Sequence, residues 1–288
     1  MPTVNQQSGT KRAATKPVKP ASIFDGLIDL ETSQVTSVRM SIYGKAKTGK
    51  TRLISTFPKP ILIIGADIGE KSGTASISGI EGIKFWPVKQ SEEAFQLVEG
   101  AHAQGFATVA VDTASMMADI FLKEILGLTD VPAHKMWGLA TREQYGQQVL
   151  KMKTFLRKVL ELPEPMNVAI VTHERNFNSG DDGGSVTQGI NPSVGSALSP
   201  QVAAWLNGAV DYLCQTYIDE KTELKTVTVG NERIEKVVGT GVPEYSLRIG
   251  SHPVYMTGFR LSPRFTLPEK IVEPDYGKIM RVIRGQKL

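Results

Sequence analysis

A glycine-rich segment near the start of the chain constrains the fold more than any other feature. Its sequence is Gly44-Lys45-Ala46-Lys47-Thr48-Gly49-Lys50-Thr51, with an apolar stretch at Ser37 to Tyr43 before it and a segment of helical character from Lys50 to Thr56 after it. This spacing matches the phosphate-binding loop pattern, in which a strand leads into the loop and the loop opens a helix. The sequence therefore predicts a strand, a phosphate-binding loop and a helix, in that order.

The residue types in this loop suit the binding of a nucleoside triphosphate. The two glycines let the backbone wrap around phosphate oxygens, and the loop amides form an anion cradle at the helix N-terminus. Lys50 supplies positive charge to the β and γ phosphates, and the Thr51 hydroxyl is a ligand for magnesium. We expect a P-loop ATPase with ATP and Mg²⁺ as cofactors, and nucleotide contacts at Gly44, Lys45, Ala46, Lys47, Thr48, Gly49, Lys50, Thr51 and Arg52.

An aspartate follows a later apolar run, Ala107 to Val111, which predicts a buried strand. At the end of that strand, Asp112 is the natural partner for Thr51 and for a magnesium-bound water. The alternative is that Asp112 caps the helix expected from Ala114, because aspartate is a favoured capping residue. We assign Thr51 and Asp112 to the metal site.

The base that orients the attacking water is expected elsewhere, because Thr113, not a glutamate, follows Asp112. The apolar run Pro60 to Ala66 predicts another strand, and Asp67 ends it, with Glu70 three residues later. Either acid reaches the γ phosphate if that strand lies beside the P-loop strand. We favour Asp67 over Glu70, with solvated loop acids as the alternative.

A fourth apolar run, Asn167 to Thr172, precedes His173 and Glu174. The carboxyl ends of parallel strands meet at one edge of a sheet, so His173 is expected near the nucleotide as a γ-phosphate sensor. It is equally compatible with a hydrogen-bonded structural histidine. A Gly/Ser/Asp/Asn-rich stretch from Arg175 to Ser196 follows and predicts a long mobile loop.

Strands alternate with helices along the rest of the chain, which indicates an α/β fold with a mostly parallel central sheet and helices on both faces. Further helices are expected at 91–104, 114–126, 141–160, 200–207 and 276–283, and further strands at 83–88, 209–218, 245–249 and 254–259. Two runs, 223–229 and 232–238, flank Gly230-Asn231 and predict a β-hairpin insertion at about 222–241. We expect one domain over 23–288.

Charge and cysteine content limit the class of protein. The net charge is +4, but Lys11, Arg12, Lys16 and Lys19 account for it, because without them 29 basic residues balance 29 acidic ones. Residues 1–22 therefore predict a disordered basic tail, with a weak DNA-binding arm as the alternative. A single cysteine excludes an intrachain disulfide, and no run of about 18 apolar residues predicts a membrane span. We expect a soluble cytoplasmic protein.

The order of these motifs resembles the RecA-like recombinase class of P-loop ATPases. In that class an acid after the strand following the P-loop activates water, an aspartate ends the Walker B strand, and a polar residue ends a later strand before a DNA-binding loop. The matching segments here are Ile64-Gly65-Ala66-Asp67, Val109-Ala110-Val111-Asp112-Thr113 and Ile170-Val171-Thr172-His173. The resemblance implies catalytic roles for Lys50, Asp67, Glu70 and His173.

The chain is also similar to phage-encoded AAA-type nucleotide-binding proteins, which are core-only RecA-like recombinases. The supporting segments are Trp137 with Tyr145-Gly146, Thr172-His173-Glu174, and the stretch from His252-Pro253-Val254-Tyr255 to Leu267-Pro268, and the likeness covers about residues 36–285. Such proteins often place two basic residues near the core's end to reach a neighbouring subunit's nucleotide. This chain has only Arg260 there, and an ion pair with a surface acid is the alternative role for it.

The same resemblance implies that the loops at 127–138 and 175–196 face single-stranded DNA. Sequence-independent binding of such DNA uses basic grooves and exposed aromatic side chains. The candidates are Lys135, Trp137, Arg175 and Phe177, although Trp137 and Phe177 are equally compatible with the core. The second loop also carries Asp181 and Asp182, which oppose DNA binding.

The leading hypothesis is an ATP-dependent protein that acts on single-stranded DNA in phage recombination or annealing, in the cytoplasm of a bacterial host. The resemblance implies a homo-oligomeric ring or filament and a single-strand-binding protein among its candidate partners. The alternative is a nucleotide-dependent switch or assembly ATPase that contacts a protein partner through the hairpin and the mobile loop. A helicase motor is a third hypothesis, which the short chain disfavours.

Overall fold

The computed structural model describes residues 35–66, 74–129, 140–177, 193–229 and 232–288. The expected tail at 1–22 and the expected domain start at residue 23 lie outside these ranges. In the described ranges no helix is both long enough and apolar enough to cross a membrane.

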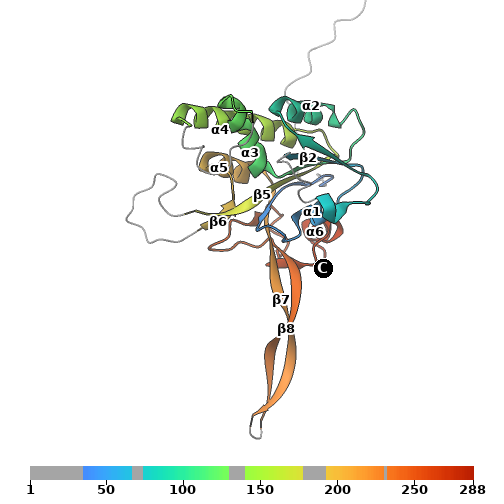
Figure 1. Cartoon of the computed structure of the whole chain (residues 1–288). Helices are drawn as coiled ribbons and strands as arrows, with labels where there is room; N and C mark the ends of the chain where they lie inside the picture. Colours follow the sequence, from blue (N-terminus) through green and yellow to red (C-terminus); the bar gives the residue numbers. More distant parts are fainter. Residues whose placement is uncertain (1–34, 67–73, 130–139, 178–192, 230–231) are drawn as a thin grey trace, which may run out of the picture. The chain divides into compact units, whose positions relative to one another are not determined.

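A mostly parallel sheet forms the centre of the unit at 35–288 (Figure 1). Its strands lie in the order β10-β8-β7-β1-β5-β4-β2-β3, and those from β7 to β3 run parallel to one another. The expected α/β fold is confirmed. The strands are β1 (Arg39–Gly44), β2 (Ile61–Ala66), β3 (Ile83–Val88), β4 (Thr108–Asp112), β5 (Asn167–Phe177), β6 (Ser193–Ser196), β7 (Tyr212–Val229), β8 (Glu232–Arg248), β9 (Gly258–Phe259) and β10 (Lys270–Val272).

Helices cover both faces of this sheet, as the sequence predicts (Figure 1). One face packs against α2 (Ser91–Ala101), α3 (Ala114–Ile125), α4 (Arg142–Leu160) and α5 (Pro200–Ala209). The other packs against α1 (Lys50–Ile54), α6 (Tyr276–Ile283) and a 3₁₀ helix at Thr74–Ile77. Because apolar side chains lie on both sides, β1, β2, β4 and the first half of β5 are buried almost throughout.

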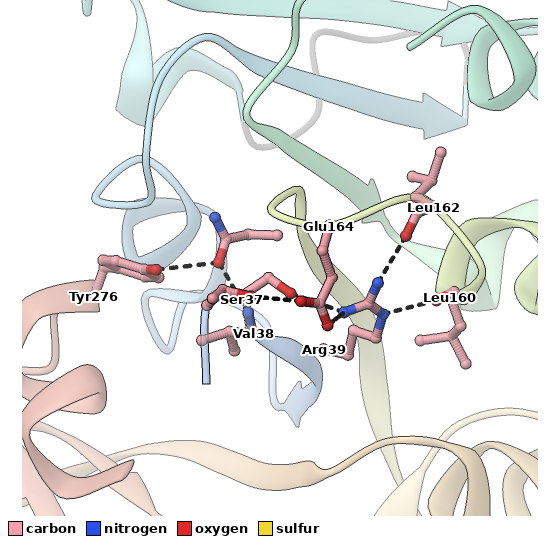
Figure 2. Close-up of polar contacts among 9 residues, drawn as sticks. Ser37, Val38, Arg39, Leu160, Leu162, Glu164 and Tyr276 are labelled. Carbon is pink, nitrogen blue, oxygen red and sulfur yellow. Dashed lines mark hydrogen bonds and ion pairs between the residues drawn. The ribbon is translucent and has the colours of Figure 1, made fainter. Parts of the chain in front are cut away.

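Polar contacts hold the start of β1 in place (Figure 2). The Arg39 guanidinium donates to the carbonyl oxygens of Leu160 and Leu162, at 2.8 and 2.7 Å. The Asn167 side-chain oxygen accepts from the Val38 amide at 2.9 Å and from the Tyr276 hydroxyl at 3.1 Å. These bonds tie the P-loop strand to the end of α4, to β5 and to α6, so the strand is fixed at the edge opposite the loop.

Two long antiparallel strands, β7 and β8, extend past the sheet as a ribbon (Figure 1). The hairpin is confirmed, but it is longer than expected, because 212–218 and 223–229 belong to one strand and 232–238 and 245–248 to another. Ala209, expected to begin a strand, instead ends α5. The strand expected at 254–259 is wrong except at Gly258–Phe259. The loop expected from Arg175 to Ser196 is wrong at both ends, where β5 and β6 pair.

Candidate functional site

The phosphate-binding loop lies between β1 and α1, as the motif requires. A Cβ atom at Gly44 would lie 2.4 Å from the carbonyl oxygen of Thr216 on β7, so only glycine fits beside that strand. Gly49 has φ of 89°, in the left-handed region that favours glycine. The two glycines therefore fix the ends of the loop, one by close approach and one by backbone conformation.

The Lys50 side chain is 7 % exposed and folds back across the loop. Its Nζ atom donates to the carbonyl oxygens of Gly44 at 2.8 Å and Lys45 at 2.6 Å. Burial lowers the pKa of Lys50, and the negative charges of Asp112 and Glu174 oppose that shift. An ammonium group has three donors, so Lys50 is held by two and has a third for a phosphate oxygen.

Asp112 and Thr51 are joined directly, although 61 residues separate them in the chain. The Thr51 hydroxyl donates to Asp112 Oδ2 at 2.7 Å. The helix-cap alternative for Asp112 is wrong, because Thr113 is the N-cap of α3 and its hydroxyl accepts from the Met116 amide at 3.3 Å. Burial raises the pKa of Asp112, and the Thr51 hydroxyl, Lys50 and His173 oppose the shift.

A hydroxyl and a carboxylate at this spacing fit the requirements of Mg²⁺. This ion prefers oxygen ligands, keeps several waters and binds proteins through one or two carboxylates together with substrate phosphates. Among the described residues, no group of three or more His, Cys, Asp or Glu side chains is arranged to hold a metal. Thr51 and Asp112 supply the oxygen ligands that a magnesium ion shared with phosphates requires.

His173 lies at the same edge of the sheet as the phosphate loop, because its partner in the parallel pairing of β5 with β1 is Gly44. Its amide donates to the Ser115 hydroxyl at 3.1 Å. Burial and the charge of Lys50 lower the pKa of His173, whereas Asp112 raises it. The half-buried imidazole is therefore biased toward its neutral form. It lies close enough to Lys50 and Asp112 for their charges to act on it.

Glu174 points to the opposite face from His173, because successive strand side chains alternate. Its carboxylate accepts a hydrogen bond from the Gln215 side-chain nitrogen Nε2 at 2.8 Å, and Gln215 Oε1 accepts from Arg248 Nη1 at 2.6 Å. The Arg248 guanidinium lies over the rings of Tyr217 and Tyr255, at 4.4 and 4.1 Å from their centroids. A polar chain thus runs from Glu174 in the second half of β5 across β7 to β8, which the sequence did not predict.

The structure does not test the acids expected to act as the base. Asp67 and Glu70 lie outside the described residues. The strand before them, β2, is not beside the P-loop strand, because β5 and β4 lie between β1 and β2. The condition set for these acids, that their strand lies beside the P-loop strand, is therefore not met, and their role stays a prediction. Local sequence identifies strands, but their order depends on the crossovers between them.

Of the four candidate DNA-binding residues, the structure describes two, and one of these is buried and the other exposed. Lys135 and Trp137 lie outside the described residues. Phe177 is 6 % exposed and belongs to the core cluster on the face that α2 to α5 cover, so its expected role as an exposed stacking residue is wrong and the core alternative holds. Arg175 is exposed, with its guanidinium 5.3 Å from the Phe177 ring centroid.

Arg260 lies far from its own chain's phosphate loop. Its Nη1 is 3.4 Å from Asp211 Oδ1, and its Nη2 donates to the Gly208 carbonyl at 2.7 Å. The neighbouring pair Tyr212 and Phe259 lies at the start of β7, the sheet edge opposite Gly44. The surface ion pair expected as an alternative for Arg260 is present, and the residue cannot act on a nucleotide held by the same chain.

The sequence over residues 36–261 matches the family model of an AAA domain. The chain belongs to the AAA domain family. With a phosphate loop, a buried lysine and a threonine–aspartate pair in place, this AAA domain is a nucleotide-binding P-loop ATPase.

The chain is similar to two solved structures at low sequence identity. A KaiC-like protein from the hyperthermophilic archaeon Pyrococcus horikoshii is 11 % identical, with a TM-score of 0.36, over 82 % of this chain and 89 % of the other. The P4 protein of bacteriophage phi6 in complex with ADP is 12 % identical, with a TM-score of 0.31, over 72 % of this chain and 59 % of the other. No curated protein matches the sequence.

Proposed function

We propose that this AAA domain hydrolyses ATP in a magnesium-dependent reaction and acts on single-stranded DNA, as a RecA-like protein of phage recombination or annealing. The hydrogen bond between Thr51 and Asp112, next to the buried Lys50, carries the ATPase part. It joins the P-loop to the end of β4, so the chain itself holds the proposed magnesium ligand beside its supporting carboxylate.

Each residue of the site has a distinct task in this reaction. Lys50 holds the β and γ phosphates and neutralises their charge, and Asp112 orients the Thr51 hydroxyl. When bound, Mg²⁺ stabilises negative charge on the phosphate oxygens. His173 donates a hydrogen bond to the γ phosphate and reports its presence. Asp67 and Glu70 are the candidates for orienting the attacking water.

The DNA part of the proposal is supported by how His173 is connected. Its carbonyl oxygen accepts from the Ala197 amide at 2.7 Å, and β5 continues beyond it to pair with β6. Residues 178–192, the centre of the loop that the resemblance assigns to DNA, connect β5 to β6. A contact between His173 and phosphate is therefore transmitted through two backbone hydrogen-bonded strands to this segment. Exposed Arg175 provides positive charge on the same strand.

A single assay tests both parts of the proposal. ATP hydrolysis by the full chain is measured with magnesium, with and without a single-stranded oligothymidine. We expect DNA to raise the turnover and Lys50→Ala to lower it on the order of 100-fold, because a buried, hydrogen-bonded charge is lost from the phosphates. Lys84→Ala removes the same charge from an exposed position on β3, at the far edge of the sheet, and should leave turnover intact.

The outcomes separate the two parts. Turnover retained in Lys50→Ala would contradict the site itself. Turnover that DNA does not change, together with no retention of the protein on DNA in the presence of ATP, would contradict the role in DNA recombination and leave the ATPase assignment standing.

A further inference from the structure

A hollow of about 310 Å³ adjoins the phosphate loop, and neither the motif nor the family match gives it a role. Its lining includes Gly49 and Arg52 beside the phosphate loop, Tyr245 of β8, and the turn at Glu273, Pro274 and Asp275. This volume is at the lower end of the range of small-molecule sites, which is roughly 300–1,000 Å³. The hollow is therefore large enough for one part of a nucleotide.

The hollow and the magnesium site lie on opposite sides of the P-loop strand. Tyr245 comes from β8, which β7 separates from β1, whereas Asp112 ends β4, on the far side of β5. The Tyr245 side chain is on the α1 face of the sheet, because Leu247, two residues later, packs in the cluster that contains α1. A ligand with its terminal phosphate near Asp112 therefore extends in the other direction, toward Tyr245.

Several polar contacts hold the turn at Glu273 to Asp275, which lines the hollow, in its conformation. The Glu273 amide donates to the Tyr245 carbonyl at 2.7 Å, and Lys278 Nζ donates to the carbonyls of Val272 and Glu273 at 2.8 and 2.7 Å. Asp275 Oδ1 accepts from the Lys278 amide at 2.8 Å. Glu273 has φ of 45°, a left-handed conformation that a residue with a side chain adopts at a cost of about 1 kcal/mol or more. The turn is thus held in place by contacts within the chain.

The chemistry of the lining fits an aromatic heterocycle. A Cβ atom at Gly49 would lie 3.4 Å from the Tyr245 ring, so the ring lies directly beside the phosphate loop. Glu273 and Asp275 bring carboxylate acceptors to the rim and Arg52 brings guanidinium donors. A base has π faces for the tyrosine and polar edges for such groups.

We propose that this hollow binds the nucleobase of the nucleotide, with Tyr245 as the residue that stacks on the base. This inference rests on the proposed ATP binding at the loop, but not on the proposed role in DNA recombination.

The test compares two ligands that differ in the base. Binding of ATP and of inorganic tripolyphosphate, both with magnesium, is measured by calorimetry on the full chain. In Tyr245→Ala we expect ATP affinity to fall about tenfold or more, because base stacking is lost, and tripolyphosphate affinity to stay within about twofold. Tyr245→Phe keeps the ring and should bind ATP as the natural protein does.

Tyr245→Leu separates stacking from packing, because leucine keeps apolar volume beside Gly49 but has no aromatic face. It should weaken ATP binding as alanine does, and together with Tyr245→Phe it decides the question even if Tyr245→Ala fails to fold. Equal loss of both ligands in Tyr245→Leu, or no loss of ATP, would overturn the role of the hollow alone. Failure of the natural protein to bind either ligand would instead overturn the phosphate site.

Discussion

Asp112 contributes a charge to the site and an acceptor for Thr51, and these two contributions can be separated. Asp112→Asn keeps an oxygen that can accept from the Thr51 hydroxyl but removes the negative charge that favours a divalent cation nearby. Magnesium contributes several kcal/mol to the stabilisation of phosphate charge in the transition state. We expect turnover to fall on the order of 100-fold.

Nucleotide affinity without magnesium serves as the internal control for Asp112→Asn, and it should change little, since Lys50 and the loop are intact. Asp119→Asn makes the same chemical change on α3 and should leave turnover unchanged. Turnover that depends on magnesium as strongly in Asp112→Asn as in the natural protein would remove Asp112 from the metal site.

Residues of the site differ in how far sequence alone identifies them. Lys50 and Thr51 are fixed by a local motif, and Asp112 follows from its position at the end of an apolar strand. Thr216 and Tyr245 have no such signal, because strand pairing across the sheet brings them to the loop. Local spacing therefore predicts the residues that hold phosphate. The positions of Thr216 and Tyr245 beside the loop depend instead on how strands far apart in the sequence pair.

Glu124 connects three helices that cover one face of the sheet. Its carboxylate accepts from the amide and hydroxyl of Ser91, both at 2.5 Å, and from Lys151 Nζ at 2.7 Å, and so joins α3 to the start of α2 and to α4. Partial burial raises the pKa of Glu124, but the hydrogen bonds from Lys151 and Ser91 outweigh it, and the pKa lies below its ordinary value of 4.5.

Glu124→Gln should therefore lower the free energy of unfolding at pH 7 by about 1–3 kcal/mol, because charge-assisted hydrogen bonds are lost. A carboxyl with a lowered folded-state pKa stabilises the fold above its unfolded pKa, and this stability is lost as the pH falls through the folded pKa. The difference between the natural protein and the variant should shrink as the pH falls below 4.5, in urea unfolding followed by circular dichroism.

Glu99→Gln is the matched control, because the Glu99–Lys158 ion pair joins two of the same helices but is exposed. Exposed pairs contribute roughly 0–1 kcal/mol, so this variant should be nearly as stable as the natural protein. Equal losses of unfolding free energy in the two variants would show that Glu124, despite its burial and its several donors, stabilises the fold no more than the exposed Glu99 does.

The elements that sequence predicts best are those with apolar runs buried on both sides. The strands β2, β4 and the first half of β5 agree with prediction to within one residue at their starts. The sequence predicts two short strands where the structure has the single strand β7, because Asp219, Glu220 and Lys221 interrupt the apolar pattern. Both faces of the ribbon are exposed there, so neither face requires apolar residues and the polar run signals no break.

At the scale of the whole unit, nucleotide binding and the outer part of the ribbon, residues 219–243, occupy separate regions. The loop, Lys50 and Asp112 lie at the carboxyl ends of the parallel strands. The described side chains from Asp219 to Thr226 are exposed, as are most of those from Glu235 to Pro243. Leu224 and Val237 lie opposite each other on the ribbon and are 69 % and 60 % exposed, so they contribute nothing to the core.

Replacing residues 220–243 by Asn-Gly should leave the ATPase core folded. Asp219 and Glu244 are paired across the two strands, and a two-residue Asn-Gly turn suits such a hairpin. Lys270 contacts both carboxylates, at 3.1 and 3.0 Å, and would still join the shortened strands to β10. We expect a melting temperature within a few degrees of that of the natural protein, and unchanged ATP affinity, by calorimetry. Tyr245 is the second residue after the replaced segment, so lost ATP affinity with an unchanged melting temperature would show that the ribbon shapes the nucleotide pocket. Loss of cooperative unfolding would show that the ribbon belongs to the core.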